Sequence, residues 1–127
     1  MREPLTPGEW TVMAALWEKS PSTLSEVIKT IGDKVQWKYN TYASYLQILI
    51  RKGFADAEMR GRDKLYYPLA DKDECIRLES LNVLKKIDKD AAKALVVNMI
   101  EQGGLSADDH AELIGLLESL MKKGGKT

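Results

Sequence analysis

Apolar side chains recur at intervals of three and four along most of the chain, the spacing that places them on one side of an α-helix. In the first part of the chain this pattern predicts helices over about 7–19, 23–31 and 39–52. Thr6 with Glu9, and Thr23 with Glu26, have the spacing of a capping box, which fixes the start of a helix. Three short helices are therefore expected before residue 53.

The pattern changes after the third predicted helix. Residues 54–59 and 64–69 are short runs of apolar, aromatic and alternating positions, separated by Arg60-Gly61-Arg62-Asp63. This order predicts a β-hairpin with a basic tip. Because Pro68 has no N–H to donate, the second strand is expected to lie at an edge or to end there.

After Ala70 the helical spacing returns, and it predicts helices over 71–87 and 88–102 and a last one that begins at Ser106. These helices carry about three apolar stripes in roughly 57 residues, too few to close a core of their own. We therefore expect two copies of the chain to pack together through them. The predicted dimerisation residues are Leu78, Leu81, Leu84, Leu95, Met99, Leu113, Leu117 and Leu120.

The predicted fold class is mainly α with a small β-hairpin. Three helices followed by a hairpin is the order of a winged helix-turn-helix domain, in which the third helix enters the DNA major groove. The sequence thus predicts a winged-helix DNA-binding domain over residues 1–70 and a helical dimerisation region over residues 71–127.

The total charge at first argues against nucleic acid as a partner, since 19 Lys and Arg balance 19 Asp and Glu and phosphate binding needs cations. The balance is uneven along the chain. From Lys34 to Lys64, seven basic side chains stand against three acidic ones, a net charge of +4. This excess falls on the third helix and the hairpin, so charge and topology both indicate double-stranded DNA as the partner.

The outer side of the third helix carries residue types that contact DNA. Asn and Gln can pair with adenine, and Ser or Thr can bond a base or a phosphate. Lys52 is expected to contact phosphate and Tyr42 to lie in the core, whereas Tyr45 fits either place. The alternative is a solvated helix and a solubilising turn. The predicted DNA-binding residues are Lys38, Asn40, Thr41, Ala43, Ser44, Gln47, Arg51, Arg60, Arg62 and Lys64.

Three stretches carry a resemblance to known proteins: Leu5-Thr6-Pro7-Gly8-Glu9-Trp10-Thr11-Val12-Met13, Lys52-Gly53-Phe54 and Tyr66-Tyr67-Pro68-Leu69. They resemble the penicillinase repressors of the BlaI/MecI/CopY family. The resemblance implies a bacterial transcriptional repressor, a homodimer with an N-terminal winged helix and a C-terminal helical dimerisation region. It also implies release by an inducing signal, commonly a metal ion or proteolysis triggered by a membrane sensor.

The chain departs from this family at three places. Where the recognition helix of β-lactam-responsive members typically reads Ser-Pro-Lys-Thr-Ile-Arg-Thr, the chain has Asn40 for Lys and Ala43 for Arg, which predicts a different operator. Where those members are cut between Asn and Phe, the chain has Asn98-Met99 as the possible cleavage site. The paired Cys-x-Cys motifs of copper-responsive members are absent, so copper sensing by that ligand set is not expected.

The remaining residues of chemical interest have structural interpretations. Trp10 and Trp17 are expected in the core, and Trp37 is expected to anchor the third helix. Cys75 lies on an apolar stripe and is expected to be buried, whereas His110 is expected to be exposed. Since no nucleophile–base set, phosphate loop or carboxylate pair is visible, we expect no enzymatic activity, no cofactor and no metal.

The sequence thus predicts a repressor that binds palindromic operator DNA as a homodimer and is released by an inducing signal. A cytoplasmic location without membrane insertion is expected, because the apolar runs are far shorter than the ~20 residues of a spanning helix. Two alternatives stay open. One is a winged-helix module that grips another protein, and the other is a repressor released by a ligand in the dimer core without proteolysis.

Overall fold

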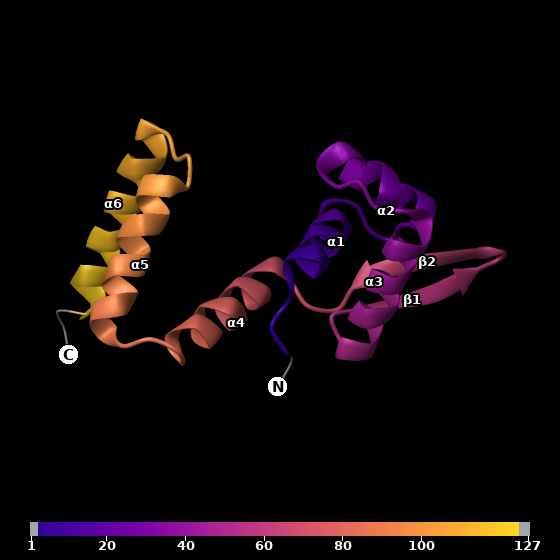
Figure 1. Cartoon of the computed structure of the whole chain (residues 1–127), viewed down its shortest axis with the longest axis horizontal. Coiled ribbons are helices and arrows are strands. Elements are labelled where there is room, and N and C mark those ends of the chain that lie inside the picture. Colours follow the sequence, from indigo (N-terminus) through magenta and orange to yellow (C-terminus); the bar gives the residue numbers. More distant parts are fainter. Residues whose placement is uncertain (1–2, 125–127) are drawn as a thin grey trace. The chain divides into compact units, whose positions relative to one another are not determined.

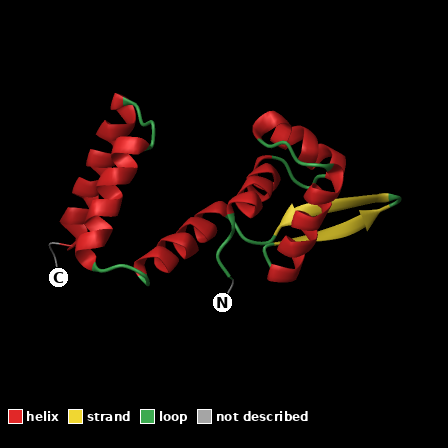
Figure 2. Cartoon of the chain, in the orientation of Figure 1, coloured by secondary structure: helices red, strands yellow, loops and turns green. Residues whose placement is uncertain are grey.

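The computed structural model describes residues 3–124. The helices and the hairpin that the sequence predicts are present (Figures 1 and 2). In chain order the elements are α1 (Pro7–Glu18), α2 (Leu24–Ile31), the 3₁₀ turn η1 (Gly32–Lys34), α3 (Tyr39–Lys52), β1 (Ala55–Arg60), β2 (Asp63–Pro68), α4 (Lys72–Leu84), α5 (Lys89–Gln102) and α6 (Ala107–Gly124).

Helix α4 ends at Leu84, earlier than the predicted residue 87. The reason lies in the start of the next helix. Asp88 has an extended backbone and its carboxylate accepts a hydrogen bond from the N–H of Ala91 at 2.8 Å, which makes it the N-cap of α5. A residue in that role cannot also continue a helix, so the chain must leave α4 before it.

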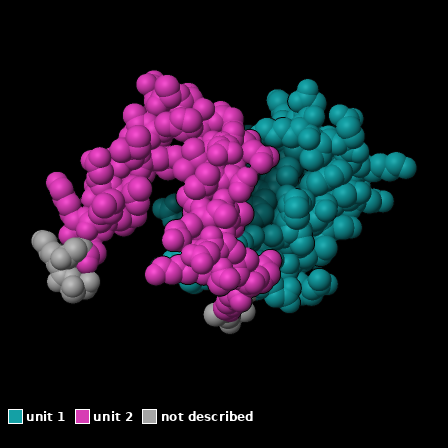
Figure 3. Space-filling model, turned by 60° about the vertical axis from the view of Figure 1, so that its left-hand side comes forward, with its two compact units in different colours: residues 1–83 teal, residues 84–127 magenta. Residues whose placement is uncertain are grey.

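The chain divides into two compact units, Met1–Val83 and Leu84–Thr127 (Figure 3). The first unit therefore includes nearly all of α4. Its inclusion follows from packing, because Cys75 is 3% exposed in the core of the first unit and Leu78 lies half-buried against that core. The predicted boundary after residue 70, between the DNA-binding domain and the dimerisation region, concerns function and stays a prediction.

The first unit closes a core to which its α-helices and its hairpin contribute. Phe54, which follows the third helix, is fully buried, as are Leu46 and Leu49 of α3. The other buried apolar side chains are Leu5, Val12, Met13, Ala15, Leu16, Val27, Ile31, Tyr42, Ala55, Tyr66, Ala70 and Cys75. Because α1, α2, α3 and the hairpin all contribute, this core fixes the direction in which α3 presents its opposite face.

Trp10 and Trp17 lie at the edge of this core. Both are half-buried and pack against it, with their rings edge to face and their centroids 5.7 Å apart. The indole Nε1 of Trp17 donates a hydrogen bond to the carbonyl of Ala70 at 2.9 Å. The prediction of a core position is thus partly confirmed, since each ring keeps some exposure. The hydrogen bond of Trp17 also ties α1 to the segment that precedes α4.

The hairpin forms one antiparallel pair, with Ala55 opposite Pro68 and Arg60 opposite Asp63. Strand β2 ends at Pro68, as its missing N–H predicts. Ser22, between α1 and α2, exchanges backbone hydrogen bonds with Tyr66 at 2.8 and 2.9 Å. This short bridge, which the sequence pattern does not reveal, attaches the base of the hairpin to the helical part of the domain.

The second unit has a different character. Within its described part, α5 and α6 contain no buried side chain. Large apolar side chains are exposed on both helices, with Met99 at 61% and Leu120 at 64%. None of the described helices is long and apolar enough to cross a membrane.

Candidate nucleic-acid interface

Helix α3 has one buried side and one open side. Tyr42, Leu46 and Leu49 recur at three- and four-residue spacing and are buried in the domain core. The opposite side carries Asn40 and Ser44, both exposed. An amphipathic helix held on its apolar side presents its polar side at a fixed angle, as a reading helix requires.

The predicted contact residues of α3 lie where the prediction needs them. Their side chains are all accessible: Lys38, Asn40, Ser44, Gln47 and Arg51 are exposed, and Thr41 and Ala43 are half-buried. Among the described residues, no ion pair or hydrogen bond neutralises the side chain of Lys38 or Arg51. Their charges are therefore available to phosphate, as the sequence interpretation assumes.

The start of α3 differs from the starts of α1 and α2. Thr6 and Thr23 close the first two helices with complete capping boxes. Lys38 occupies the N-cap position of α3, and no side chain of the described chain caps this helix. Uncapped N–H groups at a helix start favour an anion, so this end suits a DNA phosphate beside Lys38.

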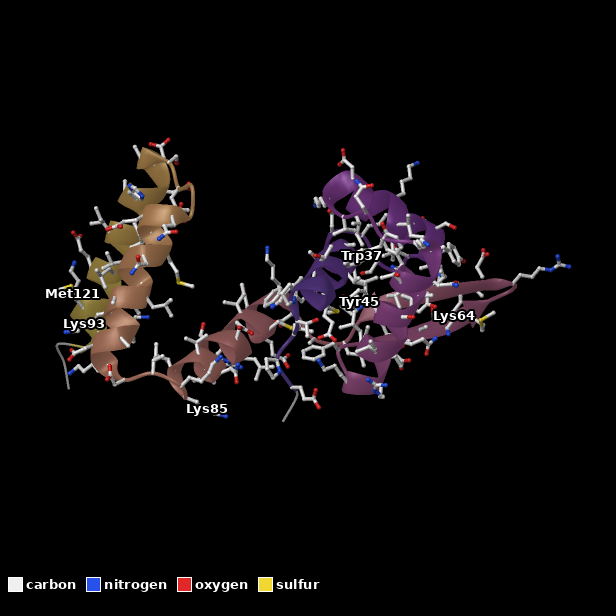
Figure 4. The ribbon with its side chains drawn as sticks, viewed as in Figure 1. Trp37, Tyr45, Lys64, Lys85, Lys93 and Met121 are labelled. Carbon is white, nitrogen blue, oxygen red and sulfur yellow. The ribbon has the colours of Figure 1, made fainter. Side chains whose placement is uncertain are left out.

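An aromatic cluster fixes α3 from its N-terminal side. The ring of Trp37 stacks on Tyr45 at 4.7 Å between centroids and meets Tyr42 edge to face at 5.2 Å (Figure 4). These contacts confirm that Trp37 anchors the helix. They also hold Tyr45, which is half-buried, against Trp37.

The accessible side of α3, which carries Asn40 and Ser44, contains a shallow hollow that the sequence interpretation missed. Its volume is about 370 Å³, and Asn40, Thr41, Ser44, Tyr45 and Ile48 line it. The signal in the sequence was weak, since Ile48 is a single apolar residue among polar neighbours on the accessible part of the helix.

The hairpin presents Arg60, Arg62 and Lys64, all exposed. Arg60 is not free, because its guanidinium lies 3.0 Å from the carboxylate of Glu58. The ammonium of Lys64, which Figure 4 labels, lies 5.4 Å from the ring centroid of Tyr66. Among described residues, Arg62 has no ion-pair partner, so it is the hairpin cation most available to a phosphate.

The structure corrects the prediction for Lys52. Its side chain is only 12% exposed, and its ammonium donates to Oε1 of Glu9 at 2.8 Å and to the carbonyl of Pro4 at 3.3 Å. An ammonium held in this way joins the end of α3 to the start of α1. Lys52 is therefore a structural residue, and not a phosphate contact.

The partner of Lys52 is a buried carboxylate. Burial raises the pKa of Glu9, but hydrogen bonds from Lys52 and from the backbone N–H of Thr6, together with the charge of Lys52, outweigh it and hold the pKa below its usual 4.5. The same carboxylate completes the capping box of α1. Glu9 thus serves one helix start and one ion pair at once.

The residues predicted for cleavage and dimerisation lie mostly outside the first core. Asn98 and Met99 are exposed on α5, where the Asn98 amide donates to the carbonyl of Ala94 at 2.8 Å. Leu78 is the exception among the predicted dimerisation residues, because it packs half-buried within its own chain. The accessible members are Leu81, Leu84, Leu95, Met99, Leu113, Leu117 and Leu120, each at least 36% exposed.

The remaining candidates have the predicted environments. Cys75 is buried and His110 is exposed. Within residues 3–124, no group of three or more His, Cys, Asp or Glu side chains could hold a metal ion.

Three helices, a hairpin wing and a third helix with a polar, basic open face make this a winged-helix DNA-binding protein. The chain matches the family described as Penicillinase repressor over residues 5–119, and it belongs to that family.

Relatives of known name cover most of the chain. It is 28% identical over 113 residues to the methicillin resistance regulatory protein MecI of Staphylococcus aureus strain N315, which covers 89% of this chain and 92% of MecI. It is 29% identical over 114 residues to the penicillinase repressor of Bacillus licheniformis, covering 90% and 89% of the two chains.

Solved structures give the same result. The monomeric form of the Bacillus licheniformis repressor BlaI, in complex with the blaP half-operator, matches 58% of this chain and 90% of its own length, with 28% identity and a TM-score of 0.51. A Staphylococcus aureus MarR structure, 19% identical with a TM-score of 0.51, covers 96% of this chain and 75% of its own, and shares the fold.

Proposed function

We propose that this protein represses transcription as a homodimer that binds a palindromic operator through α3 and the hairpin. The observation that carries the proposal is the open face of α3. There the cations Lys38 and Arg51, which have no ion-pair partner among the described residues, flank exposed polar side chains. The complex of BlaI with its half-operator supports it, because the matched part corresponds in extent to the winged-helix domain.

Each side chain is assigned a role by its chemistry. Asn40 and Gln47 suit adenine, and Ser44 or Thr41 can bond a base or a phosphate. Lys38 and Arg51 suit phosphates at the two ends of α3. Ala43 is a small side chain that lets α3 approach the base edges closely. Arg60, Arg62 and Lys64 extend the contact to the DNA backbone beside the major groove.

The proposed dimer rests on the second unit. Its exposed leucines and methionines would lose their contact with water in an interface between two copies. A two-fold dimer places two copies of α3 on successive half-sites, so the operator is expected to be palindromic. The protein would then act where the operator DNA lies, in the bacterial cytoplasm.

Release is the less constrained part of the proposal. A cut between Asn98 and Met99 would divide α5 and separate four of the eight predicted dimerisation residues, Met99, Leu113, Leu117 and Leu120, from the rest of the chain. The cut is expected to follow from a membrane sensor or protease that acts indirectly. Ligand-induced release without proteolysis has one observation in its favour, a hollow of about 660 Å³ in the first unit lined by residues that include Phe54, Arg77 and Leu78.

A gel-shift titration tests the function directly. The full chain is mixed with duplex DNA from upstream of its own gene at low salt, and binding is expected below micromolar protein. The logarithm of the affinity should fall linearly with the logarithm of salt concentration, by ~0.9 per neutralised phosphate. A protein that ignores this DNA at micromolar concentration, and instead co-purifies with a stoichiometric protein partner, would be an interaction module.

A further inference from the structure

The hollow on α3 has a chemical division that suits one feature of DNA. Asn40, Thr41, Ser44, Tyr45 and Ile48 line it, at spacings that put them along one side of the helix. Ile48, the Tyr45 ring and the Thr41 methyl group are apolar, whereas the Asn40 amide and the Ser44 hydroxyl are polar. The hollow therefore offers an apolar floor with hydrogen-bonding groups at its rim.

The wall of the hollow is held in place. Tyr45 stacks on Trp37 with an angle of 27° between the rings, and the two lie together at α3 (Figure 4). The Tyr45 hydroxyl also lies so close to Gly8 that any side chain at residue 8 would clash with it. A ring held by both Trp37 and α1 keeps the hollow open in the unbound protein.

The occupant follows from the position of the hollow. It lies beside the polar stripe of Asn40, Ser44, Gln47 and Arg51, the side of α3 that our proposed function places in the major groove. In that groove thymine alone among the four DNA bases presents a methyl group, and its partner adenine presents the acceptor and donor that an Asn amide pairs with. An apolar floor next to an Asn amide matches both halves of a T·A pair.

We propose that this hollow receives the 5-methyl group of a thymine, and that Ile48 and Tyr45 are specificity-determining residues of the protein. The inference rests on the proposed function and deepens it. Asn40 then reads the adenine of the same or the neighbouring pair, while Ile48 distinguishes thymine from cytosine by contact with the methyl group.

Deoxyuridine gives a direct test, since it lacks only that methyl group. Operator duplexes are selected from random DNA with the full chain, and each thymine is replaced in turn by deoxyuridine. Fluorescence anisotropy should show one thymine per half-site whose replacement weakens binding about four-fold, the factor expected for one buried methyl group. Replacement in both half-sites should weaken binding about sixteen-fold.

The variant Ile48→Ala identifies the hollow as the cause. It should lower the ratio between the thymine and deoxyuridine affinities from about four towards one, because the floor loses Ile48 and keeps only the Tyr45 ring and the Thr41 methyl group. Gln47→Ala is the matched control, and it should weaken both duplexes while the four-fold ratio persists. Since the result is a ratio measured on one preparation, a fraction of misfolded variant does not alter it.

Three results would overturn the proposal: a selected half-site without thymine, wild-type protein that binds every deoxyuridine duplex as well as the parent, or an Ile48→Ala ratio that stays at four. Each of these outcomes leaves DNA binding itself intact. Failure to select any duplex would instead reject the proposed function, and the thymine site with it.

Discussion

The two units of this protein are built from similar sequence patterns but differ in how their apolar faces are covered. In the first unit, α1 and α3 bury side chains such as Leu16 and Leu46 completely. In the second, α5 and α6 carry apolar side chains at the same three- and four-residue spacing, yet Leu117 is 58% exposed. Within residues 3–124, every buried apolar side chain lies at or before Cys75.

The difference teaches that apolar periodicity predicts a face to be covered without naming what covers it. In the first unit the hairpin and Phe54 close the core, so that unit is sufficient in itself. The described part of the second unit offers two helices and no sheet, which leaves its apolar faces for another molecule. We infer that the first unit folds by itself and that the second is completed by a second copy.

Removal of residues 84–127 is the strongest test of this division. The remaining winged-helix unit should stay folded, because its core lies within the first 83 residues. Its affinity for a full operator should fall by about 10²–10⁴-fold, because two linked half-site contacts become one. Sedimentation shows whether the truncated chain is a compact monomer, and fluorescence anisotropy measures its affinity for the operator. An undiminished affinity of the truncated monomer would contradict the role given to the second unit.

A pair of alanine substitutions tests the same contrast within the full chain. Phe54→Ala should lower the free energy of unfolding by about 3–5 kcal/mol, since the ring is fully buried. Leu117→Ala should leave the first unit unaffected but weaken dimerisation. Urea titrations at several protein concentrations separate the two effects. If the Leu117→Ala effect were independent of concentration, the residue would belong to a core within one chain.

Much of the fold was predictable because it follows from local chemistry. The capping pairs Thr6–Glu9 and Thr23–Glu26 form as their spacing predicts. The hairpin likewise follows from the change of period and from Pro68. The capping pairs depend on residues three positions apart, and the hairpin on two segments that follow each other along the chain.

Features that depend on distant residues were not predictable. Lys52 was expected at the DNA, but Glu9, 43 positions earlier, holds it in the protein. The bridge between Ser22 and Tyr66 involves backbone groups, which no side-chain pattern records. In the candidate site, the polar stripe of α3 was predicted, whereas the hollow beside it depends on how Trp37 and Gly8 confine Tyr45.

Loss of the ion pair between Glu9 and Lys52 should lower the free energy of unfolding of the first unit by an intermediate amount. Glu9→Gln should destabilise the protein by about 1–3 kcal/mol, since Lys52 loses its buried carboxylate partner at 2.8 Å and keeps only the exposed Glu3 at 3.7 Å. The exposed Glu18→Gln on the same helix is the control, with an expected change below about 0.5 kcal/mol.

The pKa of Glu9 fixes the pH dependence of this effect. Because it lies below 4.5 in the folded state, the carboxylate contributes stability that is fully present above pH 4.5. That contribution disappears as the pH falls through the lowered folded pKa. The difference in unfolding free energy between wild type and Glu9→Gln should therefore shrink in acid. A difference that is constant from pH 7 to pH 3 would show that the charge of Glu9 is not its cause.

The smallest effect is expected at the hairpin, where a change should affect neither the core nor the dimer. Arg62→Ala should weaken binding to all duplexes alike, and should reduce the salt dependence by ~0.9 per subunit because one phosphate contact is lost. Arg60→Ala is the comparison in the same hairpin. It should also weaken binding, because Arg60 is already paired with Glu58 and its removal frees a carboxylate charge beside the DNA. A loss of salt dependence with Arg62→Ala, at unchanged melting temperature and dimer affinity, would place the hairpin on the DNA backbone. An unchanged salt slope would remove Arg62 from the DNA interface.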